Sequence, residues 1–201
     1  MKKNAKHPVL KRLRDLYARM DQAYDASAKA IGLSCDGCTD SCCETLFRHH
    51  TYAEWMVLWE GFAALPEDRR QDMLAQAETY VRIHQNALPG TRPRVPCPAS
   101  EQRDGGLVCG IYAHRPMVCR LHGVPNVLHK PGGETAAFPG CDRAQQRAKT
   151  CPPALLDRTP LLSELARLEM DLLGQGGMSR HPRVNLTIAE MLLMGPPKIK
   201  R

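Results

Sequence analysis

The chain has 201 residues, 43% of them hydrophobic and 24% charged, so it can bury the core of one globular domain. Charged residues interrupt its apolar stretches before they reach the roughly 20 residues that a bilayer-spanning helix needs, so we expect no membrane segment and no secretory leader. The net charge of +7 fits a solubilising surface better than a nucleic-acid interface, because aromatic side chains do not interleave with the basic ones.

The first half of the chain has the pattern of amphipathic helices. Apolar residues recur at spacings of three and four over residues 8–31, and Gly32 is suited to end that helix. Residues 51–64 predict a second helix that begins with a capping box at Thr51–Glu54, and its aromatic stripe is assigned to the core. A third helix is expected over residues 66–88.

The helical pattern is lost between residues 89 and 156, where prolines punctuate the chain. Irregular segments of this length are uncommon in compact domains unless something other than a large core holds them. Short strands are only weakly indicated near residues 107–111 and 124–128. Metal ions bound by the cysteines of this segment would replace the missing core.

Helical periodicity returns near the C-terminus. Thr159 and Pro160 suit the start of a helix that ends at Gly174, residues 175–177 predict a flexible break, and Thr187 caps a last short helix. The expected fold is therefore mostly α, with helices around an irregular, cysteine-rich metal-binding centre and little or no strand. We expect one domain over residues 1–201, made of a helix at 8–31, a cysteine-cluster region at 32–151 with inserted helices at 51–88, and C-terminal helices at 157–195.

Nine cysteines are the most distinctive feature of the sequence. In a reducing cytosol, where we place this protein, clustered thiols indicate metal or redox chemistry more than structural disulfides. Two residues separate Cys35 from Cys38, which lets both thiolates grip one ion from a tight turn that Gly37 eases. Cys42 and Cys43 follow closely, and the remaining thiols lie far downstream at Cys97, Cys109, Cys119, Cys141 and Cys151.

Adjacent cysteines are awkward ligands for one ion, because neighbouring side chains in an extended chain point to opposite faces. We therefore expect Cys42 and Cys43 to serve different centres, or only one of them to be a ligand. The first option leaves enough thiols for two four-thiolate centres, although the sequence does not give the partition. The predicted metal ligands are Cys35, Cys38, Cys42, Cys43, Cys97, Cys109, Cys119 and Cys141.

Thiolate centres need hydrogen-bond donors and cations around the sulfurs. Several basic residues lie close in sequence to a cysteine and are candidates for that role, namely Arg48, His49, His50, Arg115, Arg120 and His122. The alternative is that some histidines are themselves ligands in mixed Cys–His sites, with His49, His50, His114 and His122 as candidates.

These cysteine spacings, with Cys97-Pro98 and the stretch Cys109-Gly110-Ile111-Tyr112-Ala113-His114-Arg115-Pro116-Met117-Val118-Cys119-Arg120, resemble the YkgJ-type cysteine-cluster family. The resemblance covers roughly residues 32–145 and leaves out the flanking helices. It implies metal binding, because members of that family are described as zinc- or iron-chelating domains. A related domain occurs in flagellin lysine N-methylase, which is linked to iron–sulfur chemistry.

The leading hypothesis is a cytosolic metal-thiolate protein that carries an iron–sulfur cluster or iron, with zinc as the second choice and room for two metal centres. One alternative is an enzyme that transfers methyl groups to lysine, although no nucleotide-binding glycine fingerprint supports it. Another is a zinc-stabilised module that binds nucleic acid or an acidic protein partner, although no finger-like helix follows paired ligands. The fourth hypothesis is a thiol–disulfide redox protein. The large number of thiols and the absence of a βαβ pattern around the Cys35–Cys38 pair disfavour it.

Overall fold

The computed structural model describes residues 8–35, 38, 42–103, 106–151 and 155–199. Gly37, which is expected to ease the turn between Cys35 and Cys38, lies outside these ranges. Helices outweigh strands in the described part, which confirms the mostly α class, but five short strands also form, so the expectation of little or no strand is wrong.

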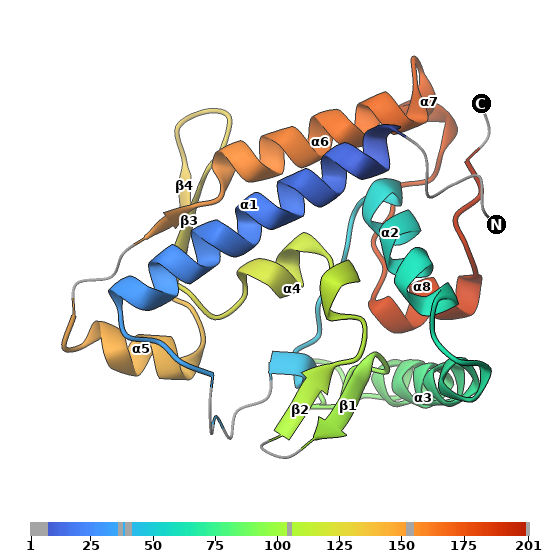
Figure 1. Cartoon of the computed structure of the whole chain (residues 1–201), viewed down its shortest axis with the longest axis horizontal. Helices are drawn as coiled ribbons and strands as arrows, with labels where there is room; N and C mark the ends of the chain where they lie inside the picture. Colours follow the sequence, from blue (N-terminus) through green and yellow to red (C-terminus); the bar gives the residue numbers. More distant parts are fainter. Residues whose placement is uncertain (1–7, 36–37, 39–41, 104–105, 152–154, 200–201) are drawn as a thin grey trace.

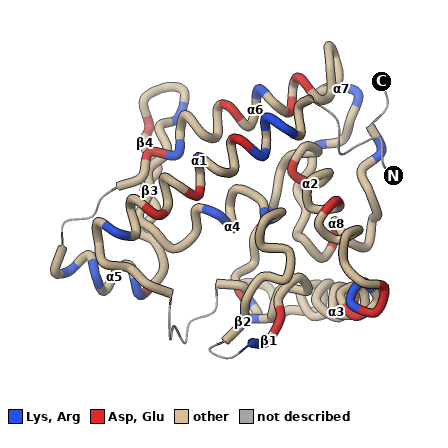
Figure 2. The backbone as a smooth tube through the Cα atoms, viewed as in Figure 1, with Lys and Arg blue, Asp and Glu red and all other residues tan. Residues whose placement is uncertain are grey.

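Two long helices lie side by side along one edge of the molecule (Figure 1). The first, α1 (Pro8–Ala30), buries a stripe of Leu10, Leu13 and Leu16 and packs against α6 (Thr159–Leu173). Charged residues of both signs occur along both helices of this pair (Figure 2). They form the ion pairs Arg12–Asp171 at 2.7 Å and Arg19–Glu164 at 2.6 Å.

Three further helices complete what we call the helical frame, namely α2 (Tyr52–Ala63), α3 (Glu67–Gln85) and α8 (Ile188–Met194). The short α8 packs on α3, and the indole N–H groups of Trp55 and Trp59 both donate to the carbonyl of Met191. The aromatic stripe of α2 is therefore core, as its sequence predicts. No helix among the described residues is both long and apolar enough to cross a bilayer.

The helix ends match the sequence in most places and differ in three. Thr51 accepts the Glu54 N–H at 3.2 Å, but the Glu54 carboxylate bonds the N–H of Met117 at 2.7 Å, so only half of the expected capping box forms. Arg158, and not Thr159, is the N-cap of α6. A four-residue helix, α7 (Gly177–Arg180), begins within the predicted break.

The segment between the frame helices, residues 89–156, is named the cysteine-rich segment. Its strands form an antiparallel hairpin and a three-stranded sheet of order β4-β3-β5. Two α-helices that the sequence does not predict, α4 and α5, interrupt it, because each is too short for a periodic pattern to be visible. The elements are β1 (Ser100–Arg103), β2 (Gly106–Cys109), α4 (Met117–Leu121), β3 (Asn126–His129), β4 (Thr135–Phe138), α5 (Asp142–Ala148) and β5 (Leu156–Asp157), with 3₁₀ turns η1 (Cys42–Glu44) before it and η2 (Tyr112–His114) within it.

Candidate metal centre

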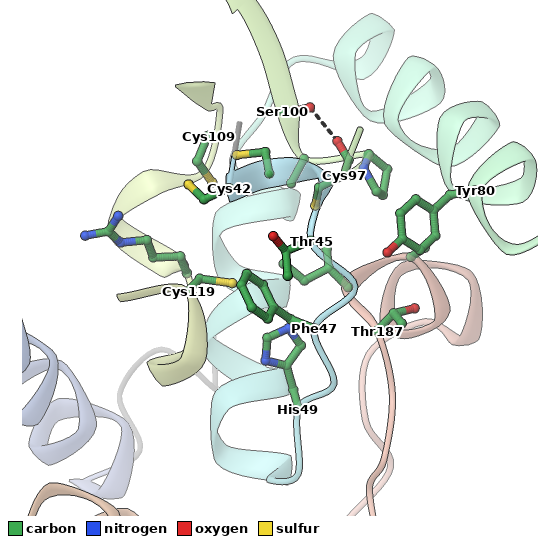
Figure 3. Close-up of a pocket in the computed structure, with 16 residues that line it drawn as sticks. Cys42, Thr45, Phe47, His49, Tyr80, Cys97, Ser100, Cys109, Cys119 and Thr187 are labelled. Atoms are coloured by element: carbon green, nitrogen blue, oxygen red, sulfur yellow. Dashed lines mark hydrogen bonds between the residues drawn. The ribbon is translucent and has the colours of Figure 1, made fainter. Parts of the chain in front are cut away.

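A cavity of about 70 Å³ lies where η1, the β1–β2 hairpin and α4 meet α3 and α8 (Figure 3). That volume exceeds several-fold the roughly 15 Å³ that one water molecule requires. Five cysteines contribute sulfur atoms to its wall, beside hydroxyl and basic side chains and apolar groups such as Phe47. Its cysteines come from distant parts of the chain, namely Cys42, Cys43, Cys97, Cys109 and Cys119.

Backbone hydrogen bonds bring η1 to the hairpin. The N–H of Cys97 donates to the carbonyl of Cys43 at 2.8 Å, and the carbonyl of Cys97 accepts from the N–H of Ser100 at 2.8 Å. Ser100 is also the residue that pairs with Cys109 across the hairpin. These bonds fix three cysteines of the cavity relative to one another without using their side chains.

Cys119 is placed by α4, which is attached to the helical frame at both ends. At its first residue, Met117, the N–H donates to the buried carboxylate of Glu54 in α2. Near its last residue, the guanidinium of Arg120 is 3% exposed and pairs with Asp21 of α1 at 2.6 Å. The frame therefore fixes the position of the thiol between these two anchors.

Arg120 does not serve the sulfurs, contrary to the expectation from its sequence position. Besides Asp21, it donates to the carbonyls of Ala113 and Arg115, at 2.6 Å and 2.8 Å. Its donors thus hold together the turn that precedes α4, and they explain why an arginine follows Cys119 in the sequence.

Arg115 is the cation that faces the thiols. It lines the cavity, stacks 3.6 Å above the ring of Tyr112 and reaches Asp21 with one Nη atom, while its Nε is buried without a partner among the described residues. Its positive charge lowers the pKa of Cys109 and Cys119, but burial acts more strongly in the opposite direction and raises both. Arg115 is therefore a donor available to a thiolate.

Two of the cavity thiols, Cys42 and Cys97, have a raised pKa, which favours their protonated form. Burial raises the pKa of Cys97 to about 12, and a hydrogen bond with Cys43 raises the pKa of Cys42. Metal binding here has to displace protons, because only thiolates are good ligands.

His49 borders the same cavity and is 1% exposed. Its backbone pairs with Leu186, but neither ring nitrogen has a partner in the part of the chain that the structure describes. Burial, assisted by the neighbouring His50, lowers the pKa of His49 to about 4, so its ring is neutral at physiological pH. His114, another candidate, instead packs against Gly61 of α2.

A second group of thiols lies around Tyr24 of α1. Its hydroxyl contacts the sulfur of Cys35 at 3.9 Å, and negative charge on Cys35 or Cys141 raises the pKa of Tyr24, after the larger effect of burial. The pKa of Cys141 is in turn raised by burial and by the proximity of Cys38 and Cys35. The structure therefore brings Cys141, at the start of α5, next to the first cysteine pair.

Cys42 and Cys43 do not diverge as an extended chain would require. They lie in the 3₁₀ turn η1, where successive side chains are about 120° apart, and both border the cavity. Cys42 is also close enough to Tyr24 to influence its pKa, so it lies between the two groups of thiols. Cys151 is exposed and lines neither the cavity nor the surroundings of Tyr24.

The donor set fits a metal centre, although its side chains are not yet arranged around one ion. Soft thiolates from separate segments select zinc, iron or iron–sulfur clusters, and the buried Nε of Arg115 and the ring of His49 are unpaired groups that such a centre would satisfy. Among the described residues, no three cysteine, histidine or carboxylate side chains stand at the spacing that holds a single ion.

A fold whose irregular middle gathers thiols into one cavity defines a cysteine-cluster protein. A family model described as "putative zinc- or iron-chelating domain", named for its CxxCxxCC pattern, matches residues 34–152, and the chain belongs to that family. The match covers the cysteines of both groups and excludes α1, α6 and α8. Neither the comparison with curated proteins nor the comparison with solved structures found a match.

The sequence does not identify two residues of the site, Tyr24 and Phe47, as functional. The pattern assigns Tyr24 only to the apolar face of its helix, and it gives Phe47 no role. A tyrosine that precedes a cysteine pair by a few helical turns gives no local signal of its role, because its partner Cys141 lies more than a hundred residues further along the chain.

Proposed function

We propose that this protein is a cytosolic metal-thiolate protein that holds iron–sulfur clusters in two four-thiolate centres. The inner centre uses the cavity thiols Cys43, Cys97, Cys109 and Cys119. The outer centre, beside Tyr24, uses Cys35, Cys38, Cys42 and Cys141. This assignment gives the adjacent pair one cysteine in each centre, as the sequence suggests.

The observation that carries this proposal is the convergence of five cysteines from separate segments on one cavity. Specific hydrogen bonds position most of these thiols, such as Cys97 N–H to Cys43 and Met117 N–H to Glu54. The cluster is therefore a built feature of the fold. Arg115 adds the positive charge that a centre with several thiolates needs.

The spread of the thiols supports a cluster over a single zinc ion. Thiolates around one tetrahedral ion, with bonds of about 2.3 Å, lie only about 3.8 Å apart. No three donors in the described part of the chain have that spacing. A cluster of several irons bridged by sulfides holds its four cysteines at the corners of a larger body, which suits thiols distributed around a cavity wall.

The visible spectrum of protein purified without oxygen tests the choice of metal. The proposal expects a brown protein that bleaches with dithionite and contains equal amounts of iron and acid-labile sulfide. A colourless protein that contains zinc would refute the iron–sulfur assignment and leave only the family's metal-chelating character.

Single cysteine variants test the two centres separately. Cys119→Ser should remove about half of the iron and sulfide, and Cys141→Ser should remove the other half, because each centre loses one of four ligands. Cys151→Ser is the matched control and should keep the full content, since its thiol is exposed and belongs to neither centre. Equal iron content in all three variants would refute the proposed ligand sets.

A further inference from the structure

A second and larger cavity, of about 480 Å³, lies between α4 and the three-stranded sheet. Its walls are mainly apolar, with Met117 and Leu121 of α4 on one side and Leu162 of α6 on another. Its volume is in the range of pockets that bind small organic molecules. The proposed cysteine ligands do not line it, although His50 and His122 do, so it needs a separate explanation.

The sheet places three chemically distinct side chains on the face toward this cavity. Asn126 is paired with Phe138 of the antiparallel strand and with Leu156 of the parallel strand. Arg158 lies two residues after Leu156, and its N–H continues the pairing by donating to the carbonyl of Val127. Since side chains alternate along a strand, Asn126, Phe138 and Arg158 share one face, and all three line the cavity.

Two of these side chains have polar atoms without partners. Asn126 is 6% exposed, its Nδ2 donates to the carbonyl of Val124 at 3.1 Å, and its buried Oδ1 accepts nothing from the described residues. The bond to a carbonyl settles which end of the amide is the oxygen, because only the nitrogen can donate.

Arg158 is the second such side chain. Its guanidinium lies 3.7 Å from the ring centroid of Phe138, which holds the group flat against the cavity wall. Its Nε is buried and unpaired, and it forms no ion pair in the part of the chain described. A half-buried cation without a carboxylate is costly unless a ligand supplies the negative charge.

We infer that this cavity binds a small organic carboxylate that has an apolar body and a hydrogen-bond donor. The carboxylate accepts from the fork of Arg158, the donor reaches Oδ1 of Asn126, and the apolar body fills the space against α4. The planar fork of Arg158 matches the two oxygens of a carboxylate, and the imidazoles of His50 and His122 are the other basic groups that line the cavity.

This cavity shares a wall with the thiol cavity, which is the one that the five cysteines of the candidate metal centre line. Phe47 lines both this cavity and the thiol cavity, so its side chain is common to the walls of both. Val118 precedes Cys119, and Gly140 precedes Cys141, so the walls of the ligand cavity continue into both proposed centres. The inference itself stands without any metal, because its polar groups belong to the sheet.

Three related probes test it by isothermal titration calorimetry. Phenyllactate carries a ring, a carboxylate and a hydroxyl; phenylpropionate lacks the hydroxyl; phenylpropanol lacks the carboxylate. We expect one molecule of phenyllactate to bind per chain, more tightly than either of the others. Arg158→Gln should weaken phenyllactate binding about ten- to a hundredfold and leave phenylpropanol unchanged. Asn126→Ala should remove the advantage of phenyllactate over phenylpropionate.

Arg167→Gln, an exposed arginine on α6, is the matched control and should bind all three probes like the unaltered protein. Arg158→Gln should fold, because it removes a cation that lacks a partner, and its thermal melt verifies this. Equal binding of phenyllactate and phenylpropanol, or equal weakening by both arginine variants, would overturn the inference. So would the absence of saturable binding in protein whose metal content is complete, a result that would leave the proposed metal centres unaffected.

Discussion

The helical frame and the cysteine-rich segment are stabilised in different ways. The frame buries continuous stripes of leucine and methionine, such as Leu13 and Met20 in α1 and Leu168 in α6. None of the largest fully buried side chains of the described residues comes from residues 89–156. The segment adds smaller apolar side chains such as Ile111, Leu121 and Val124 to the edge of that core, and it depends further on short strands, on polar anchors to the frame and, in our proposal, on metal.

The difference shows how a chain can fold a region that lacks a core of its own. Glu54 and Asp21 extend from the frame to the two ends of α4, and coordination through Cys119 would fix what remains between them. A region built this way should respond to metal, and the frame should respond mainly to the loss of apolar packing. The following experiments, from the largest expected effect to the smallest, test that contrast.

Removal of the metal should have the largest effect, and it should destabilise the cysteine-rich segment far more than the helical frame. Because coordination replaces a core in the segment, its local stability should fall by about 5 kcal/mol, which is several-thousandfold in the rate of amide exchange. Hydrogen exchange followed by mass spectrometry would then show fast exchange in β1, β2 and α4 and nearly unchanged exchange in α1 and α6. Equal acceleration in both regions would contradict the division.

Among single substitutions, Arg120→Met should have the largest effect on stability. It leaves the carbonyls of Ala113 and Arg115 without this donor and removes one of the two arginine partners of Asp21, which should lower the free energy of unfolding by about 3–4 kcal/mol. Arg19→Met, which removes the exposed pair with Glu164, is the control and should cost less than about 1 kcal/mol. Urea denaturation measures both, and similar losses would refute the role of Arg120.

His49 should make the metal-free protein sensitive to acid. Its pKa is about 4 in the folded chain, below the ordinary value near 6.5, so between these values the unfolded chain binds a proton that the folded chain does not. Its contribution to stability is complete above pH 6.5 and is lost as the pH falls toward 4, by about 3 kcal/mol in total.

The comparison of metal-free wild type with His49→Leu isolates that contribution. Glu54 and Glu169, whose pKa values burial raises, are present in both proteins and cancel in the difference. The unfolding free energy of the wild type minus that of His49→Leu should fall by about 3 kcal/mol from about pH 7 to about pH 4. A constant difference would mean that the His49 ring has a partner or is accessible to water.

The smallest expected effect concerns α8 in the frame. Thr187 and Glu190 form a complete capping box, with Oγ1 of Thr187 accepting the N–H of Glu190 at 3.2 Å. Thr187→Ala should lower stability by about 1 kcal/mol, and Thr187→Ser should restore most of it, because serine keeps the acceptor. An effect on metal content larger than on stability would show instead that Thr187 acts through the cavity that it lines.

The frame is predictable from sequence because its signals are local. The spacing of apolar residues places α1, α2, α3 and α6 to within a few residues, and Thr187 with Glu190 marks the start of α8. The predicted cap of α2 is only half right, because Glu54 bonds Met117, a partner 63 residues away that no local pattern reveals.

The cysteine-rich segment is predictable in chemistry and less so in shape. The spacing of the thiols indicates metal, and the family match agrees with a zinc- or iron-chelating domain. The grouping of Cys141 with Cys35 and Cys38 cannot be predicted, because the path of the chain through α4, the sheet and α5 decides it. The role of Arg120 is hidden for the same reason, since Asp21 lies in a distant helix.

The bond from the Met117 N–H to Glu54 has a consequence for the kinetics of metal exchange. A movement of α4 away from α2 that opens the thiol cavity breaks this bond, which leaves the Met117 amide without its acceptor and removes one of the donors to the buried Glu54 carboxylate. Small fluctuations of α4 are therefore insufficient to release what the thiols hold. Exchange should occur in rare, discrete openings, at a rate governed by how firmly α2 is seated in the core.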